Sequence, residues 1–375
     1  MTMKLLFLVT EDWYFCSHRM ALAQAAQASG YAVSVLCRVK HHGDVIRDAG
    51  FELIDLPMRR GGLNPAREWM TLVRIWQVYR RLKPDLVHQV AVKPVVYGSL
   101  AAWFLPTIKQ VNLLAGLGTV FSARHWKTSV LKFLLKRLFR WLLRQPHVIT
   151  VVQNRQDYAV LTEQLGLLPQ QVRLIKGSGV DIEQFGYSAM PPPPLRLALV
   201  SRLLWDKGIA EFVAAARLLK QKGLQFQALL VGEPDEENIR SIGVEQLKDW
   251  QDEGVVDCVG RIDDVAAFWR SVHIAVLPSY REGLPKTLLE AAASGRPIIT
   301  TDTAGCNEIV EHEVNGLLVP VRSVPPLADA LERLVSNPAL CAQMGKAGRT
   351  KVETEFANAL VFAQTLAVYR ELFND

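Results

Sequence analysis

Residues 277–301 read LPSYREGLPKTLLEAAASGRPIITT, and this stretch decides the fold class. The apolar run Ile274–Leu277 predicts a buried strand directly before it. A helix is expected to begin near Pro285, because proline costs nothing at the first helical position. Gly295 is expected to end that helix before the next buried strand. Strand, helix and strand in this order predict a parallel α/β unit.

The same alternation runs along the whole chain of 375 residues. Near the N-terminus, a helical pattern at Ser17–Ser29 lies between strand-like runs at Lys4–Val9 and Ala32–Cys37, which suits a right-handed parallel crossover. Four consecutive prolines, Pro191–Pro194, can continue neither a helix nor a central strand and indicate a linker.

We therefore predict two doubly wound, Rossmann-like α/β domains that face each other across a cleft. The first is expected at residues 1–188 and the second at 195–355, followed by a helix in 356–375 that packs back on the first domain. Such sheets bind ligands at the carboxyl ends of their strands.

Composition narrows the class of protein. Half of the residues are apolar and about a fifth are charged, which excludes global disorder. The net charge of +6 suggests anionic partners, with nucleotide phosphates, an anionic lipid surface and nucleic acid all open. The five cysteines form no C-x-x-C pair, so neither a zinc knuckle nor a redox motif is expected. No uncharged apolar run reaches about 18 residues, so no spanning helix is expected.

Two glutamates of the deciding stretch are candidate ligand-binding residues. Glu282 is expected in the loop before the helix, and Glu290 eight residues later inside it. The amides of Gly283, Leu284 and Lys286 then point out of a helix start, which attracts anions. A diphosphate fits there, with Glu282 on sugar hydroxyls and Glu290 on ribose hydroxyls. The alternative is a capping residue and a solvated helix position.

Residues 282–301 resemble the E-x7-E signature of retaining glycosyltransferases of family 4, which have the GT-B fold. Further family landmarks occur in the expected order: SRLLWDKG at 201–208, KGSGVD at 176–181 and NGLLVP at 315–320. Three segments of the first half resemble the branch that builds bacterial O-antigen, capsule and exopolysaccharide, namely 83–88, 93–98 and 115–121.

The resemblance implies roles for individual residues. Arg202 and Lys207 follow a strand and are expected to neutralise the diphosphate leaving group, so they are catalytic candidates together with Glu282. Glu290 is expected to hold the ribose. The other donor-binding candidates are Gly283, Leu284, Pro285, Lys286, Gly260 and Arg261. The family retains anomeric configuration, and no metal or other cofactor is expected, since cations and helix amides replace it.

The first domain carries weaker candidates. His18 follows the first strand in a loop that lacks the glycines of many relatives, and it is expected to meet the acceptor or the donor. His88 is a cleft candidate whose alternative is a core histidine. The remaining acceptor or cleft candidates are Asn112, Gly116 and Gly118, where glycine permits close approach to the backbone.

Residues 124–145 read RHWKTSVLKFLLKRLFRWLLRQ and predict a basic helix on anionic lipid. Four cations spaced four apart form one stripe: Lys132, Lys136, Arg140 and Arg144. The alternative is a domain helix that buries its leucines and keeps a solvated basic edge. Residues 64–83 carry further Arg and Trp side chains that widen this surface.

The expected function is transfer of a hexose or N-acetylhexosamine from a UDP-sugar donor to an undecaprenyl-diphosphate-linked saccharide. The expected location is the cytoplasm, at the inner face of the membrane, with an anionic membrane surface and no nucleic acid as partner. One rival is a UDP-N-acetylglucosamine 2-epimerase of the same architecture, and another is a non-enzymatic binder of anionic membranes. A nicotinamide oxidoreductase is disfavoured because no G-x-G-x-x-G follows the first strand.

Overall fold

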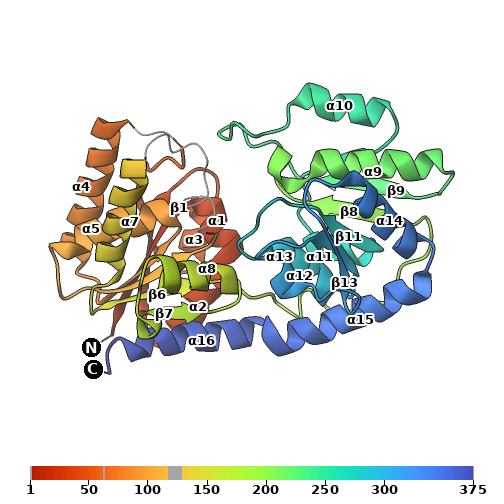
Figure 1. The fold of residues 1–375 in the computed structure, drawn as a ribbon. Coiled ribbons are helices and arrows are strands. Elements are labelled where there is room, and N and C mark those ends of the chain that lie inside the picture. The colour runs from red at the N-terminus through yellow and green to blue at the C-terminus, as the bar shows by residue number, and fades with distance from the viewer. Residues whose placement is uncertain (1, 62–63, 117–128, 375) are drawn as a thin grey trace. The chain divides into compact units, whose positions relative to one another are not determined.

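The computed structural model describes residues 2–61, 64–116 and 129–374. The chain forms two compact units (Figure 1). The first comprises Met1–Ser178 with Ala359–Asp375, and the second comprises Gly179–Asn358.

The first unit is built on a seven-stranded parallel sheet with the order β3-β2-β1-β4-β5-β6-β7. Its strands are β1 (Lys4–Glu11), β2 (Ala32–Arg38), β3 (Glu52–Asp55), β4 (Leu86–Val90), β5 (Lys109–Leu114), β6 (Val148–Val152) and β7 (Val172–Leu174). Its helices are α1 (Asp12–His18), α2 (Met20–Ala28), α3 (Gly43–Asp48), α4 (Pro65–Leu82), α5 (Val92–Trp103), α7 (Ser129–Leu143), α8 (Arg155–Ala159) and α16 (Asn358–Glu371).

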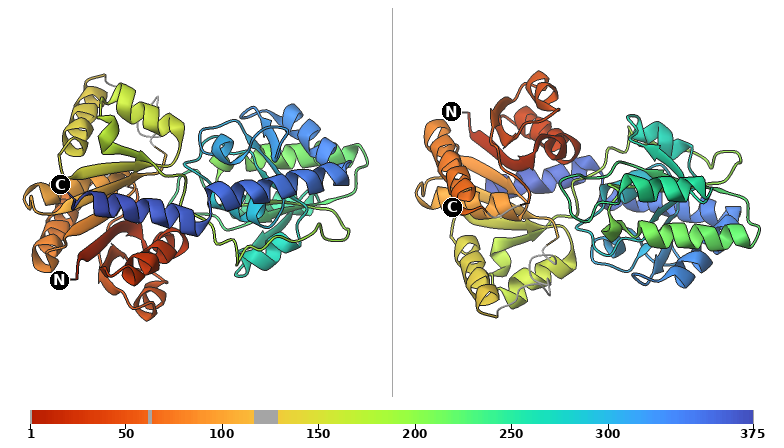
Figure 2. Two further views of the ribbon diagram at one scale, coloured as in Figure 1. Left: turned by 90° about the horizontal axis from the view of Figure 1, so that it is seen from below. Right: turned by 90° about the horizontal axis from the view of Figure 1, so that it is seen from above.

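Helices cover both faces of this sheet. On one face α4 and α5 pack through Ile75, Tyr79 and Ala101 against strand residues such as Leu8. On the other face α16 packs through Val361, Val368 and Tyr369, as the view from below in Figure 2 shows. The last helix of the chain therefore belongs to the core of the first unit.

The second unit is built on a six-stranded parallel sheet with the order β10-β9-β8-β11-β12-β13. Its strands are β8 (Arg196–Val200), β9 (Gln227–Val231), β10 (Asp257–Gly260), β11 (Ile274–Leu277), β12 (Ile298–Thr301) and β13 (Gly316–Val319). Its helices are α9 (Ile209–Gln221), α10 (Val244–Asp252), α11 (Val265–Arg270), α12 (Lys286–Ala293), α13 (Cys306–Ile309), α14 (Val324–Val335) and α15 (Pro338–Glu355). The stretch that decided the fold class is β11, α12 and β12, in the predicted order.

The boundary between the units differs from the predicted linker. The four prolines lie inside the second unit, which begins at Gly179. The segment before them is packed: Val180 and Phe185 join the core of the second unit, and the buried guanidinium of Arg296 donates to the carbonyl oxygens of Ser188 and Ala189. Proline prevents regular structure but not packing, so the prolines mark an irregular segment and not the domain boundary.

Both sheets reverse their strand order beside their first strand, between β1 and β4 in the first unit and between β8 and β11 in the second. Such a switch point separates the loops that follow two adjacent strands and leaves room for a ligand. Within the described ranges, no helix has the length and apolarity needed to cross a membrane.

Candidate functional site

The switch point of the second unit carries an ion pair between two predicted catalytic residues. Lys207 lies in the loop after β8, and Glu282 lies in the loop after β11. The ammonium nitrogen of Lys207 lies 2.6 Å from Oε1 of Glu282. Their side chains are 19% and 10% exposed, so water screens the pair only partly. The structure therefore brings these two residues together at the edge where such sheets bind ligands.

Backbone contacts hold the two loops against each other. The carbonyl oxygen of Asp206 accepts from the amide of Tyr280 at 2.9 Å and from the hydroxyl of Ser279 at 3.1 Å. Gly208 has a φ of +71°, and a Cβ there would lie 2.1 Å from the carbonyl oxygen of Pro278. Only glycine fits there, so Gly208 permits the close packing of the two loops at the start of α9.

The loop after β12 packs against the loop that carries Glu282, a contact that the sequence analysis missed. A Cβ on Gly305 would lie 2.3 Å from the carbonyl oxygen of Gly283 and 2.9 Å from that of Glu282. The hydroxyl of Thr301 donates to the carbonyl oxygen of Ser279. A glycine four residues after a predicted strand was the available signal, but its contact partner lies more than 20 residues away in the sequence.

Glu290 is buried in α12, with 8% of its surface exposed. Burial raises the pKa of the Glu290 carboxyl, and the ammonium of Lys286, at 3.2 Å, opposes that shift. Lys286, which was expected to contribute its backbone amide, thus also holds Glu290 through its side chain. Glu290 is not a solvated helix position.

The start of α12 lies next to Glu282. Within the described residues no side chain caps this helix, whose N-cap residue is Pro285. The first amides of any helix lack an intrahelical acceptor and give that end a partial positive charge, and here no side chain of a described residue accepts from them. Together with Lys207, it forms an arrangement that favours an anion such as a phosphate.

Arg202 lies on the side of β8 that faces β9. Its Nη1 lies 2.6 Å from Oδ2 of Asp235, which follows β9. Asp235 was not anticipated because nothing near it in the sequence shows that it meets Arg202. Gly260 is the last residue of the edge strand β10, and Arg261 follows it. β10 lies two strand spacings, or about 10 Å, from β8. The side chain of Arg261 is 61% exposed.

β1 is followed directly by helix α1 and not by the expected loop, and Asp12, the first residue of α1, holds the loop after β2. Its carboxylate accepts from the amides of Lys40, His41 and His42 at 2.6, 3.0 and 2.9 Å. Burial by itself would raise the pKa of Asp12, but these backbone hydrogen bonds outweigh it and lower the pKa. His18 lies at the end of α1, stacked on Tyr14 with ring centroids 4.3 Å apart. Its contact with acceptor or donor stays a prediction.

Two cleft candidates are wrong. His88 is 1% exposed, stacks on Phe7 and is hydrogen-bonded through Nδ1 to the hydroxyl of Tyr369. Burial, and secondarily Arg19, lower the pKa of His88 well below its usual value, so the ring is a neutral core residue. Asn112 is fully buried, and its amide nitrogen lies 3.4 Å from the hydroxyl of Ser99. Both residues lie inside the sheet layer, where no substrate reaches them.

The other two cleft candidates are glycines. Gly116 has a φ of +86°, and its amide donates to Asp157, a residue that the sequence analysis did not single out. Gly118 lies outside the described residues.

The predicted membrane helix is α7. Its Phe139, Leu142 and Leu143 are buried in the first unit, whereas Arg140 and Arg144 are exposed and Lys136 is partly exposed. The side chain of Lys132 lies outside the described part of the chain. The burial of one face and the solvated basic edge agree with the alternative of a domain helix. Contact of that edge with a membrane stays a prediction.

An aromatic cluster lies beside this basic edge. Trp103 at the end of α5 contacts Trp141 of α7 and Phe104, with ring centroids 5.4 and 5.0 Å apart. All three are exposed, by 53%, 40% and 64% for Trp103, Trp141 and Phe104. The helices α4, α5 and α7 lie side by side in Figure 1.

In the part of the chain that the structure describes, no three His, Cys, Asp or Glu side chains are grouped so that they could hold a metal ion.

Two family models match the chain. The model "Glycosyl transferase 4-like" matches residues 4–154, and the model "Glycosyl transferases group 1" matches residues 194–337. The first match spans β1 to β6 of the first sheet, and the second spans all six strands of the second sheet.

Curated relatives match over most of their length. An N,N'-diacetylbacillosaminyl-diphospho-undecaprenol alpha-1,3-N-acetylgalactosaminyltransferase of Campylobacter jejuni is 26% identical over 341 residues, covering 88% of this chain and 88% of the relative. The capsular polysaccharide biosynthesis glycosyltransferase CapM of Staphylococcus aureus is 22% identical, covering 85% of each chain.

Solved structures resemble the whole chain. Sucrose-phosphate synthase of Thermosynechococcus elongatus has a TM-score of 0.79 at 22% identity and covers 99% of both chains. HepE of Anabaena in complex with UDP has a TM-score of 0.77 at 18% identity, with 98% of this chain and 100% of HepE covered. The predicted GT-B fold of two doubly wound domains is confirmed.

Proposed function

The chain belongs to the glycosyltransferases with a 4-like N-terminal domain and a group 1 C-terminal domain, and we propose a specific reaction for it. It transfers a hexose or N-acetylhexosamine from a UDP-sugar to a saccharide linked to undecaprenyl diphosphate. The transfer retains the anomeric configuration and serves the assembly of a bacterial surface polysaccharide or glycan. The name of the Campylobacter relative supports the lipid-linked acceptor, and the complex of HepE with UDP supports the nucleotide.

The observation that carries this proposal is the Lys207–Glu282 pair beside the uncapped start of α12. As the bond between sugar and diphosphate breaks, negative charge accumulates on the leaving diphosphate. Lys207, Arg202 and the amides of α12 stabilise that charge more strongly in the transition state than in the bound donor, which is what accelerates a reaction.

The two glutamates have different tasks in this proposal. Glu282 accepts hydrogen bonds from hydroxyl groups of the donor sugar. Its ion pair with Lys207 keeps the ammonium directed at the diphosphate. Glu290 accepts hydrogen bonds from the ribose hydroxyls, and the Lys286 ammonium beside it opposes the rise in its pKa that burial causes. Arg202, held by Asp235, supplies a planar guanidinium to the second phosphate.

The membrane part of the proposal rests on the first unit. We propose that the exposed basic edge of α7, with Trp103, Phe104 and Trp141 beside it, contacts an anionic membrane surface at the inner face of the cytoplasmic membrane. Aromatic rings at an interface and cations near anionic headgroups both favour such contact.

The test is a binding and hydrolysis screen of UDP-, GDP- and dTDP-sugars with the purified chain. We expect binding of a UDP-sugar and slow release of UDP. Product analysis by NMR separates the candidates, since a transferase releases UDP and a sugar, whereas an epimerase releases an isomeric UDP-sugar. Failure to bind any sugar nucleotide would contradict the proposal.

A further inference from the structure

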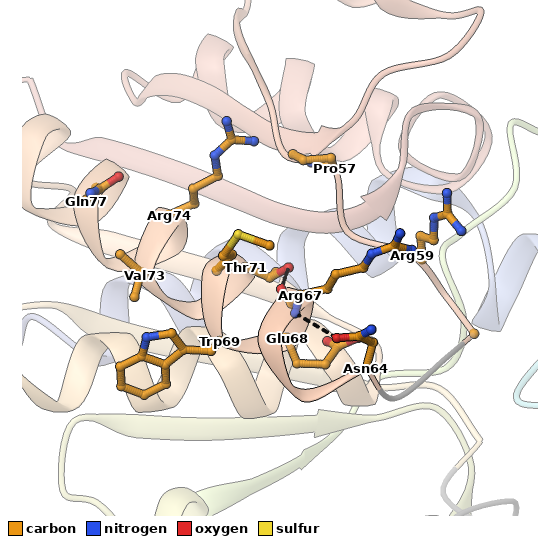
Figure 3. Close-up of a pocket in the computed structure, with 12 residues that line it drawn as sticks. Pro57, Arg59, Asn64, Arg67, Glu68, Trp69, Thr71, Val73, Arg74 and Gln77 are labelled. Carbon is orange, nitrogen blue, oxygen red and sulfur yellow. Dashed lines mark hydrogen bonds between the residues drawn. The ribbon is translucent and has the colours of Figure 1, made fainter.

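A cavity of 690 Å³ lies on the first unit, between α4 and the segment that follows β3 (Figure 3). This volume falls in the range of ligand sites, about 300–1,000 Å³. Its lining includes three arginines and several apolar side chains: Arg59, Arg67, Arg74, Trp69, Met70 and Val73. The sequence analysis expected the Arg and Trp side chains of residues 64–83 to widen a basic surface and did not single out Arg59. The proposed transfer does not account for a cavity here.

The cavity carries uncompensated positive charge. Arg59, Arg67 and Arg74 are exposed and form no ion pair with any residue that the structure describes. The acid in the lining, Glu68, is already paired: the ammonium of Lys93 lies 2.8 Å from Oε1, and the hydroxyl of Tyr97 donates to Oε2 at 2.7 Å. The three guanidinium groups are therefore free to bind an anion, and guanidinium groups bind phosphate oxygens in pairs.

The positions of these arginines are fixed from two sides. Arg67 and Arg74 are seven residues apart, so they lie two turns apart on one face of α4. Figure 3 shows both extending toward the segment that carries Pro57 and Arg59. Lys93 also donates to the carbonyl oxygen of Arg59 at 2.7 Å, which ties this segment to α5.

The apolar side chains of the cavity lie on two sides of α4. Met70, three residues after Arg67 and four before Arg74, shares the side of the arginines, whereas Trp69 and Val73 share a face that the two arginines do not occupy. Trp69 is 66% exposed and Met70 is 57% exposed, so both are available to an apolar ligand group. Cations and exposed apolar side chains in the lining of one cavity match a ligand with a phosphate head and a hydrocarbon tail.

We propose that this cavity binds the diphosphate end of the isoprenoid lipid that carries the acceptor saccharide. Arg59, Arg67 and Arg74 hold the diphosphate, and Trp69 and Met70 contact the first isoprene units. This inference rests on the proposed function, which supplies the lipid-linked acceptor. A free diphosphate has the same charged groups but no hydrocarbon part to contact Trp69 and Met70.

Isothermal titration of the full-length chain tests the proposal with three probes: farnesyl diphosphate, inorganic pyrophosphate and farnesol. UDP is kept in excess so that any nucleotide site is occupied. We expect farnesyl diphosphate to bind at least about tenfold more tightly than pyrophosphate, and farnesol to bind weakest. Arg67→Ala and Arg74→Ala should each weaken farnesyl diphosphate binding by about tenfold, because each removes charge-assisted hydrogen bonds.

Two further variants identify the source of the binding. Trp69→Ala should weaken farnesyl diphosphate and leave pyrophosphate unchanged. Arg81→Ala is the matched control, because Arg81 is an exposed arginine of the same helix outside the lining. Circular dichroism checks that each variant is folded.

Two results would overturn the proposal. Pyrophosphate that binds as tightly as farnesyl diphosphate would make this a site for a free diphosphate. An equal loss in Arg81→Ala would reduce the binding to general electrostatic attraction. Titration of UDP alone into the wild-type chain tests the transferase proposal separately, so a failure of one inference is not read as a failure of the other.

Discussion

At the carboxyl end of β1, a carboxylate of the chain itself accepts hydrogen bonds from the backbone amides of the neighbouring loop, whereas at the carboxyl end of β8 a lysine and a helix start without a side-chain cap leave room for another anion. The Asp12 carboxylate accepts hydrogen bonds from three amides of the loop after β2. Residues 12–18, which follow β1, contain no glycine. Lys207 and Glu282 instead meet each other across two loops that Gly208 allows to touch.

The comparison explains why two sheets of similar design differ in their chemistry. Backbone amides at the carboxyl ends of strands attract a negative group, and the group can be a side chain or a ligand. Because Asp12 already binds the amides after β2, a phosphate gains little from binding beside it and is repelled by the carboxylate charge. The second unit keeps a lysine and a helix start without a side-chain cap at the corresponding edge.

Removal of the Lys207 ammonium should have the largest effect. We expect Lys207→Ala to lower kcat by about 100- to 1,000-fold, since it removes one preorganised charge from the leaving group. Steady-state kinetics with the donor identified by the screen measures it. Lys248→Ala, which changes an exposed lysine of α10, is the control. An unchanged kcat in Lys207→Ala would abolish the contrast between the two switch points.

A side chain at position 208 should disrupt the contact between the loops after β8 and β11. Gly208→Ala should lower the free energy of unfolding by about 2–4 kcal/mol, because it adds a clash with Pro278 to the strain of a positive φ. Gly223→Ala has a similar positive φ and open space around its Cβ, so it isolates the strain alone. Chemical denaturation measures both, and equal losses would show that the close approach contributes nothing.

Asp12→Asn tests the comparison at the carboxyl end of β1. The folded pKa of Asp12 is lowered, so its charged form adds stability above the ordinary value of 3.8, and that stability is lost as pH falls through the folded pKa. We expect a loss of about 1–2 kcal/mol at pH 7 that shrinks in acid. Denaturation of both proteins at pH 7 and pH 3 measures it. A difference that stays constant with pH would contradict this assignment.

Chelation should have the smallest effect. If Lys207, Arg202 and the amides of α12 together neutralise the diphosphate, transfer should persist after dialysis against EDTA. The measurement is kcat before and after dialysis, with added Mg²⁺ as the control. A loss of activity that Mg²⁺ restores would mean that these cations are insufficient.

Much of the second unit was predictable from its sequence. The β11–α12–β12 order follows from an apolar run, a proline at the helix start and a glycine at its end, which are local signals. The sequence predicted only that Lys207 and Glu282 serve the same ligand, not that they pair with each other. Its geometry depends on residues 75 positions apart, and nothing local specifies their separation.

The first unit was harder to predict. His88 and Asn112 stand at or within buried strands, where sequence does not distinguish a side chain that points into the core from one that points to a cleft. Tyr369, almost 300 residues later, decides the role of His88 by packing α16 on the sheet. The domain boundary failed for the same reason, since Arg296 packs the segment before the prolines onto the second unit.

The sequence by itself determined the two parallel sheets, the order of β11, α12 and β12 and the family, because periodicity, turn residues and motif spacing act over short stretches of chain. Only the tertiary structure decided that Asp12 binds the loop after β2, that His88 is a core residue and that three arginines line a cavity. These outcomes depend on which distant groups meet after folding, and desolvation and pairing then decide whether each charge is satisfied or remains available to a ligand.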